Sequence, residues 1–293
     1  MTLPGTPTRV DYPAGALTST ATVLHVAPAA DGLVAVVTDT TCFHPVDAAW
    51  PDQPADRGVL RTSGRELPIA DAVVAATDGA ELHLGDAVPV RKGTEGWTFV
   101  VAHLVDAAGA PAEGDEVGIA ADPELRAALS VGHTACHLAS LALNRALAGR
   151  WSKEPRRDAL GAPDFDGTAI QSSRIEADGS VDRYRLNKSL RRAGFDTASL
   201  DEAALPALAA EVRATLAEWV AADAAVRVEA EGPTLTDRRS WVCELPDATA
   251  RIPCGGTHAA STGALGDLDV QFELGDDAGT PVLVMTTRAT PRG

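Results

Sequence analysis

The sequence predicts an α+β protein, in which a β-rich part over residues 1–120 precedes a part over 121–293 that combines helices with strands. Three observations predict it. Short runs over 16–105 alternate apolar and polar residues, with Gly and Asp at the turns between them. A run rich in Ala and Leu then begins near residue 122 and is apolar on nearly all sides. With 293 residues and 45% apolar composition, the chain can bury a large core in one or two domains.

Several short strands are expected in the first part. The run TATVLHVAPAADGLVAVVTDTTCF contains two extended stretches around Ala-Asp-Gly, which indicates a β-hairpin. The runs AELHLGDAVPV and GWTFVVAHLVD continue the alternation. Strands at this spacing are typical of a small barrel or a sandwich. The small and polar stretch DAAGAPAEGDEV then leads out of this part.

The second part is predicted to begin with a buried helix. Asp122 can cap the N-terminus of the helix with its side chain. The proline and glutamate that follow it are favoured in the first turn of a helix. The helix is expected to run to about Leu147. A second helix is predicted over SLDEAALPALAAEVRATLAEWVAADAAV, where Ser199 and Glu202 match a capping box. The C-terminal run LDVQFELGDDAGTPVLVMTTRA is interpreted as two strands around Gly-Asp-Asp.

The charge and the cysteines limit the classes of partner. The chain has 25 basic and 41 acidic residues, a net charge of −16, which argues against general affinity for membranes or nucleic acid but is compatible with a local basic face. It has no apolar run of the roughly 18 residues needed to span a bilayer, and no signal-peptide pattern. The four cysteines lack a paired spacing. We therefore expect a reduced, cytoplasmic protein with no membrane or DNA partner.

Two pairs of candidate metal ligands lie far apart in the sequence. His133 and His137 are four residues apart on the predicted helix, so their Cβ atoms lie about 5–6 Å apart on one face. Cys254 and His258 have the same spacing around Gly-Gly-Thr, in which the glycines suit a tight turn close to an ion or ligand. Imidazole nitrogens and a thiolate are the donors that zinc prefers.

Each pair alone has a simpler interpretation. Two histidines in an apolar helix can be core residues bonded to backbone, and Cys254 can be an ordinary buried thiol. Taken together, the four residues favour a metal site built from two segments. A zinc-protease helix is disfavoured because Thr134 stands where that helix needs Glu. A Cys254–His nucleophile pair is a further alternative, although nothing marks a third group to orient it.

The runs HTACHLASLAL and CGGTHAASTG together resemble the editing domain of alanyl-tRNA synthetases and its freestanding AlaX-type relatives. An earlier stretch, VVTDTTCFHPVDAAWPDQPADRGVL, resembles that family's segment Asp-x-Thr-x-Phe-Tyr-Pro-Glu-Gly-Gly-Gly-Gln-Pro-x-Asp-x-Gly. The resemblance covers roughly residues 20–290. The positions that match the earlier segment are Asp39, Thr41, Phe43, Pro45, Gln53, Pro54, Asp56 and Gly58.

The resemblance implies a small N-terminal β-barrel over 1–120 and an α/β zinc-binding editing domain over 121–293. It implies a stand-alone enzyme that hydrolyses the ester of a wrongly charged aminoacyl-tRNA in trans, with zinc as its cofactor. The metal ligands that it implies are His133, His137, Cys254 and His258.

Several residues are expected to act around the ester. The two histidines of the helix act in catalysis through the ion that they hold. The N–H groups of Gly255 and Gly256 are expected to stabilise negative charge that develops on the carbonyl oxygen. Thr41 and Gln53 are expected to contact the substrate, with Thr41 facing the amino-acid side chain.

The chain departs from the family where the family has its three glycines. Here the sequence reads DAAWP, with Trp50 in the loop, and His44 and Val46 replace the family's Tyr and Glu. Because that loop approaches the aminoacyl pocket in the family, Trp50 indicates a substrate-binding pocket shaped for a different amino acid. The substrates considered are fluorothreonyl-tRNA, which a deacylase branch of this family hydrolyses, and seryl- or glycyl-tRNA of the alanine system. A simpler interpretation makes Trp50 a packing residue.

A basic segment follows the first predicted helix. Residues 145–192 contain eleven basic and seven acidic residues, a net charge of +4 in an acidic chain. We expect this segment to bind tRNA phosphates, with Arg191 and Arg192 among the contacts, although a solvated surface is an alternative. Two other functions stay open: a zinc hydrolase of a small ester or amide, and a non-catalytic tRNA-binding protein.

Overall fold

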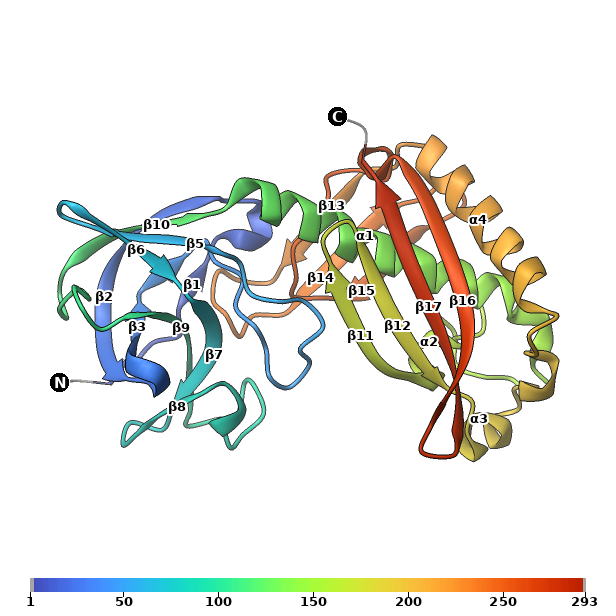
Figure 1. Ribbon diagram of the computed structural model, residues 1–293, viewed down its shortest axis with the longest axis horizontal. Coiled ribbons are helices and arrows are strands. Elements are labelled where there is room, and N and C mark those ends of the chain that lie inside the picture. The colour runs from blue at the N-terminus through green and yellow to red at the C-terminus, as the bar shows by residue number, and fades with distance from the viewer. Residues whose placement is uncertain (1–2, 292–293) are drawn as a thin grey trace. The chain divides into compact units, whose positions relative to one another are not determined.

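The computed structural model describes residues 3–291, which form two compact units (Figure 1). Unit 1 contains the residues up to Arg126, together with Val228–Arg239 and Gly255–Thr257. Unit 2 contains Ala127–Arg227, Ser240–Cys254 and the residues from His258 onward. Within 3–291, no helix combines the length and the apolar character that crossing a membrane requires.

Unit 1 is built on one large antiparallel sheet. Its strands are β2 (Thr18–Pro28), β3 (Leu33–Thr38), β5 (Gly58–Thr62), β6 (Arg65–Ile69), β7 (Asp71–Thr77), β8 (Leu82–Leu84), β9 (Thr98–Asp106) and β10 (Glu116–Ala121). Their order is β6-β5-β10-β2-β3-β9-β7-β8. Two further short strands, β1 (Arg9–Val10) and β4 (Thr40–Thr41), pair in parallel. The strands predicted over 16–105 are confirmed.

The structure does not show the closed barrel that was predicted. In β2, residues 18–22 pair with β10 and residues 23–28 pair with β3, with a register shift between Val23 and His25. The sheet stays open among the described residues, since no pairing joins the end strands β6 and β8. β8 has only three residues before the 3-10 turn Gly85–Ala87, which leaves it too short to extend the sheet further. The fold is a mixture of helices with several open sheets.

A buried ion pair holds the segment before β5 in place. Arg126 Nε donates to Asp56 Oδ1 at 2.7 Å, and a second guanidinium nitrogen contacts the other carboxylate oxygen. The guanidinium also donates to the carbonyls of Cys42 at 2.7 Å and Ala16 at 3.1 Å, while the His44 N–H donates to the carboxylate at 2.5 Å. The guanidinium thus donates four hydrogen bonds and both carboxylate oxygens accept, and such hydrogen bonding is the condition under which a buried ion pair is tolerated.

A second hydrogen-bonded group lies inside unit 1. The Val36 carbonyl, 3.1 Å from His103 Nδ1, can only accept, which assigns the ring proton to Nδ1. His103 Nε2 then accepts from the Thr41 hydroxyl at 2.9 Å, and the Thr41 oxygen accepts from the Phe43 N–H at 3.0 Å. Burial lowers the pKa of His103 to about 4, and the hydrogen bond to Val36 offsets only part of this effect. His103 is therefore neutral at physiological pH.

The pKa of His103 predicts acid sensitivity. The pKa in the folded protein, about 4, lies below the ordinary value of 6.5, so the unfolded chain binds the proton first as pH falls. Between pH 7.5 and 5 this group should lower the free energy of unfolding by about 2 kcal/mol. Burial raises the pKa of Asp166 to about 7, so protonation of this carboxyl adds stability as pH falls, and it does so in wild type and in a His103 variant alike. We therefore expect wild type to lose about 2 kcal/mol more than His103→Gln in urea unfolding over this range; equal losses would contradict the assignment.

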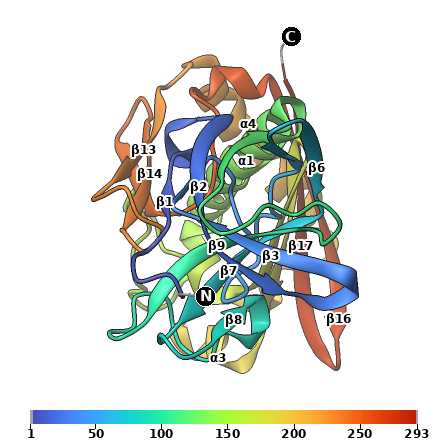
Figure 2. The same ribbon diagram turned by 90° about the vertical axis from the view of Figure 1, so that its left-hand side faces the viewer.

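Unit 2 contains a four-stranded antiparallel sheet with helices on one face. The strands are β11 (Ile170–Glu176), β12 (Gly179–Arg185), β16 (Asp267–Asp277) and β17 (Thr280–Thr290), in the order β11-β12-β17-β16. The helices α1 (Pro123–Ala146) and α4 (Leu205–Ala221) lie on the same face of this sheet (Figures 1 and 2). The shorter helices are α2 (Asp166–Ala169) and α3 (Lys188–Ala193). A smaller sheet has the order β13 (Val226–Ala230), β14 (Arg239–Glu244), β15 (Thr249–Pro253).

The position of α1 is set by the cap at its N-terminus and by its close contact with the turn between β11 and β12. Asp122 Oδ1 accepts the N–H groups of Glu124 at 2.9 Å and Leu125 at 3.2 Å, so the predicted helix start is confirmed. Gly132 is required by packing, because a Cβ there would lie 2.3 Å from the Glu176 carbonyl oxygen. The helix therefore lies directly against the turn between β11 and β12.

Three predicted boundaries are wrong. The capping box at Ser199 does not start α4, which begins at Leu205, because Pro206 is tolerated only in the first turn of a helix. The same helix ends at Ala221, before the predicted end at Val226, which is the first residue of β13. The C-terminal hairpin is confirmed, but its turn lies at Ala278 and Gly279, whose φ values of 50° and 83° are positive. The predicted Gly-Asp-Asp turn is instead the end of β16.

Candidate metal centre

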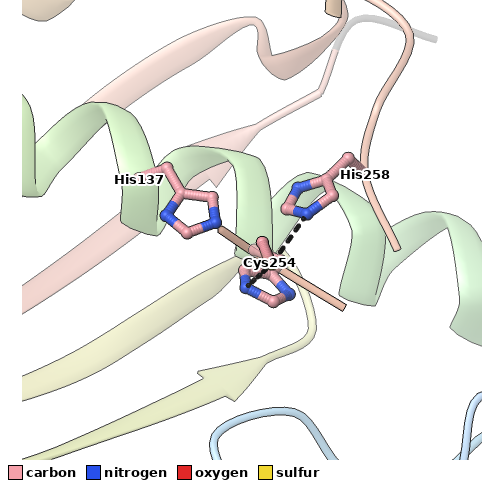
Figure 3. A group of neighbouring side chains, drawn as sticks. His137, Cys254 and His258 are labelled. Atoms are coloured by element: carbon pink, nitrogen blue, oxygen red, sulfur yellow. Dashed lines mark hydrogen bonds between the residues drawn. The ribbon is translucent and has the colours of Figure 1, made fainter. Parts of the chain in front are cut away.

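The structure brings the two predicted ligand pairs together in unit 2. His133 and His137 lie one turn apart on α1, Cys254 directly follows β15, and His258 follows the Gly-Gly-Thr turn. One donor atom from each of the four residues lies within 4.8 Å of all the others. Figure 3 shows the side chains of His137, Cys254 and His258 gathered beside α1. His133 is buried and the other three are partly buried.

Two of the separations between donor atoms are those expected around a tetrahedral ion. Cys254 Sγ lies 3.4 Å from His133 Nε2 and 3.3 Å from His258 Nε2. Bonds of about 2.0–2.3 Å from zinc to nitrogen and sulfur place neighbouring donors about 3.3–3.8 Å apart in a tetrahedron. The ring centroids of His133 and His258 are 4.4 Å apart, and those of His137 and His258 are 5.2 Å apart. All four donor atoms lie within 4.8 Å of one another, so the cluster could hold one ion.

His137 has an unused ring nitrogen. Its Nε2 is buried and has no hydrogen-bond partner among residues 3–291, although buried polar groups are nearly always paired. Burial lowers the pKa of His137 well below its ordinary value, and nearby His133 lowers it further. The ring of Trp241, on β14, packs against it with a centroid separation of 5.0 Å. A neutral imidazole with a free lone pair is the form that binds a metal, so these residues fit zinc.

Sequence reasoning missed two neighbours of this cluster. Trp241 is fully buried against His137, and its Nε1 has no hydrogen-bond partner within the described part of the chain. Thr134 lies with its hydroxyl oxygen 3.3 Å from His258 Nδ1. The sequence contains no signal for Trp241, which stands in an ordinary strand. Thr134 could have been found, since it directly follows the first histidine.

Gln53 lies against the turn that carries the glycines. Its carboxamide donates to the Thr257 hydroxyl at 3.0 Å and accepts the Thr257 N–H at 3.1 Å, and both side chains are buried in unit 1. Gly255 has open space beside it, because a Cβ there would meet no atom within 4 Å. Packing therefore does not require glycine at 255, which leaves room for a ligand close to the backbone. The substrate contacts predicted for Thr41 and Gln53 stay predictions.

Trp50 lies on the surface of unit 1. Its side chain is 47% exposed, and Leu17 is the other large apolar residue exposed within 3–291. The preceding residues Asp47 and Ala48 line an open cleft, where Asp47 pairs with Lys92 at 2.6 Å. The ring of Trp50 is therefore partly accessible to solvent, and its predicted contact with the substrate stays a prediction.

Two groups of cations stand out in the basic segment 145–192. One group is paired with carboxylates, and its members are Arg145, Arg156, Arg157 and Arg185. On α3, Lys188, Arg191 and Arg192 are exposed and form no ion pair with another described residue. The Asn187 side chain caps this helix by accepting the Leu190 N–H at 3.0 Å. α3 therefore presents three uncompensated positive charges to solvent.

Comparison with known proteins gives one weak relationship over most of the chain. No family model matches the sequence. The chain is 30% identical over 249 residues to the alanine–tRNA ligase of Pyrobaculum neutrophilum (strain DSM 2338 / JCM 9278 / NBRC 100436 / V24Sta). The alignment covers 80% of this chain but only 22% of the ligase, so the chain corresponds to about a fifth of that protein's length. This chain is thus similar to a segment of an alanine–tRNA ligase, and it carries a four-residue histidine and cysteine cluster able to hold a metal.

Proposed function

We propose that this protein is a zinc-dependent aminoacyl-tRNA deacylase that acts in trans on a mischarged or non-canonical aminoacyl-tRNA. The observation that carries the proposal is the convergence of His133, His137, Cys254 and His258 within 4.8 Å. The similarity to part of an alanine–tRNA ligase supports a tRNA substrate. The reaction adds water to the ester at the tRNA 3′ end, breaks the bond from the carbonyl carbon to the ribose oxygen, and releases the amino acid.

The four clustered residues would hold the zinc, with Cys254 as thiolate and three neutral imidazoles. Zinc with an open or exchangeable position would polarise the ester carbonyl or lower the pKa of bound water to about 7, whereas zinc held by all four residues would position the substrate. The N–H groups of Gly255 and Gly256 would donate to the ester carbonyl oxygen as negative charge develops on it. The open space beside Gly255 is consistent with this role.

Thr41 and Gln53 are proposed substrate contacts in unit 1. Each would exchange an existing hydrogen bond for one to the substrate, since Thr41 now bonds to His103 and Gln53 to Thr257. The proposed amino acid is a threonine analogue such as fluorothreonine, or serine or glycine on alanine tRNA. Removal of fluorothreonine from tRNA would give resistance to that amino acid.

A panel of charged tRNAs tests the function. The purified protein is incubated with seryl-, glycyl-, alanyl-, threonyl- and fluorothreonyl-tRNA, with and without a zinc chelator. Chelator-sensitive release of one amino acid well above the others is the expected result. Cleavage of small esters with no release from any charged tRNA would instead indicate a small-molecule hydrolase, and tRNA binding without any cleavage would indicate a non-catalytic protein.

Trp50→Ala tests the altered loop. If the ring contacts the aminoacyl group, its loss should narrow the ratio of kcat/KM between preferred and rejected aminoacyl-tRNAs by about tenfold or more, the range of one apolar pocket contact. Zinc content should not change, because Trp50 is not among the clustered residues. Leu17→Ala, at the other exposed large apolar side chain, is the matched control. An unchanged ratio would place the specificity element outside Trp50.

Neutralising α3 tests the tRNA surface. The double variant Arg191→Gln/Arg192→Gln should raise KM for charged tRNA more than it lowers kcat, because phosphate contacts contribute equally in ground and transition states. The slope of log affinity against log salt should become shallower by about 1.5–2. The control is Arg156→Gln/Arg157→Gln, whose guanidinium groups already pair with Asp164 and Glu154. Equal slopes in both double variants would exclude α3 as the phosphate contact.

A further inference from the structure

Thr134 makes three contacts on the edge of the metal cluster. Its hydroxyl lies 2.9 Å from the Ser130 carbonyl oxygen, one turn earlier on α1. The Ala259 N–H donates to the Thr134 oxygen at 3.0 Å, and His258 Nδ1 lies 3.3 Å from the same oxygen. Thr134 is completely buried. One hydroxyl therefore joins the helix that carries two of the clustered histidines to the turn that carries the third.

The direction in which this hydroxyl donates its single proton decides which ring nitrogen of His258 carries a proton. A threonine hydroxyl donates once and accepts twice. The carbonyl of Ser130 can only accept, and it is the partner that threonine in a helix commonly uses. If Thr134 donates to Ser130, its oxygen accepts from the Ala259 N–H and from a proton on His258 Nδ1. The other nitrogen of His258, Nε2, then carries the lone pair of the ring and lies 3.3 Å from Cys254 Sγ.

In the alternative arrangement, the hydroxyl of Thr134 donates to His258 and not to Ser130. Thr134 could donate to His258 Nδ1, which would leave the proton of the ring on Nε2, between the ring and Cys254. The distances favour the first arrangement. The oxygen of Ser130 is closer to the hydroxyl than the His258 nitrogen is, 2.9 Å against 3.3 Å. The Ala259 N–H donates to the Thr134 oxygen at 3.0 Å in either arrangement.

We infer that Thr134 is a positioning residue, which holds the proton of His258 on Nδ1 and so directs the Nε2 lone pair into the metal cluster. This inference rests on the proposed zinc-dependent function and adds a residue to it. Partners of this kind fix the ring orientation of a ligating histidine, and their loss typically weakens metal binding about 10–100-fold.

The test compares Thr134→Val, which keeps the shape but removes the hydroxyl, with Thr134→Ser, which restores it. Zinc affinity is measured by competition with a chelator on the full chain, and circular dichroism checks the fold. We expect Thr134→Val to bind zinc at least about tenfold more weakly than wild type and Thr134→Ser to bind within about threefold of it. Long-range ¹H–¹⁵N correlation spectra of metal-free protein at pH 8 should show the His258 proton on Nδ1 in wild type and in the serine variant.

The possible outcomes distinguish failure of the proposed role of Thr134 from failure of the proposed deacylase function. Wild-type zinc affinity in a folded Thr134→Val protein, or a proton solely on Nε2 in metal-free wild type, would overturn the role of Thr134 while leaving the deacylase proposal standing. A wild-type protein that binds no zinc would overturn both. If the valine variant fails to fold, the position of the His258 proton in wild type still decides the hydrogen-bonding arrangement.

Discussion

Replacement of His137 or Cys254 by alanine is expected to reduce bound zinc from about one ion per chain to a small fraction, and deacylation by about a hundredfold or more. The two residues come from α1 and from the end of β15, so each variant removes one side of the cluster. Loss of one donor leaves three, which hold the ion less tightly and no longer in the same place. Elemental analysis of protein purified without chelator, together with the tRNA deacylation assay, measures both effects.

The matched control is Cys243→Ala. Cys243 is a fully buried cysteine on β14 in the same unit, and it is not one of the clustered residues. It should lose some stability through a small cavity, yet keep wild-type zinc and activity. Circular dichroism must accompany the assays, because a structural zinc would couple to folding. Full zinc content in either ligand variant would contradict the metal centre.

Arg126→Ala is expected to lower the free energy of unfolding by about 3–5 kcal/mol, the cost of leaving one partner of a buried ion pair uncompensated. The side chains of Arg126 and Asp56 are only 6% and 1% exposed. The substitution would also leave the carbonyls of Cys42 and Ala16 without the guanidinium. Urea denaturation at pH 7 measures the loss.

An exposed pair in the same unit is the control. Arg61 and Glu66 are 52% and 60% exposed, so Arg61→Ala should cost less than about 1 kcal/mol. Adding Asp56→Asn to Arg126→Ala should recover part of the loss, because the unpaired buried charge is then removed. An Arg126 variant that is no less stable than the Arg61 variant would show that the pair contributes nothing.

The sequence by itself determined the helices and strands that depend only on residues close together in the chain. The N-cap at Asp122, the apolar run of α1 and the alternating strands of unit 1 were all predicted, since each follows from the geometry of a single helix or strand. The four-residue spacing of His133 and His137 already placed both rings on one helix face. The identity of the candidate ligands could be predicted for the same reason, together with the resemblance that paired the two motifs.

Tertiary structure alone decided what depends on contacts between distant segments. No local pattern distinguishes the observed open sheet from a closed barrel, because closure depends on the pairing of β6 and β8 at its ends. Thr41 and Gln53 were matched to substrate contacts, but the packed fold gives their side chains protein partners in His103 and Thr257. The convergence of α1 with the turn around His258, and the hydroxyl of Thr134 that joins them, also required the fold. Spacing along the chain sets which side chains share an element, whereas the packing of sheets and helices sets which elements meet.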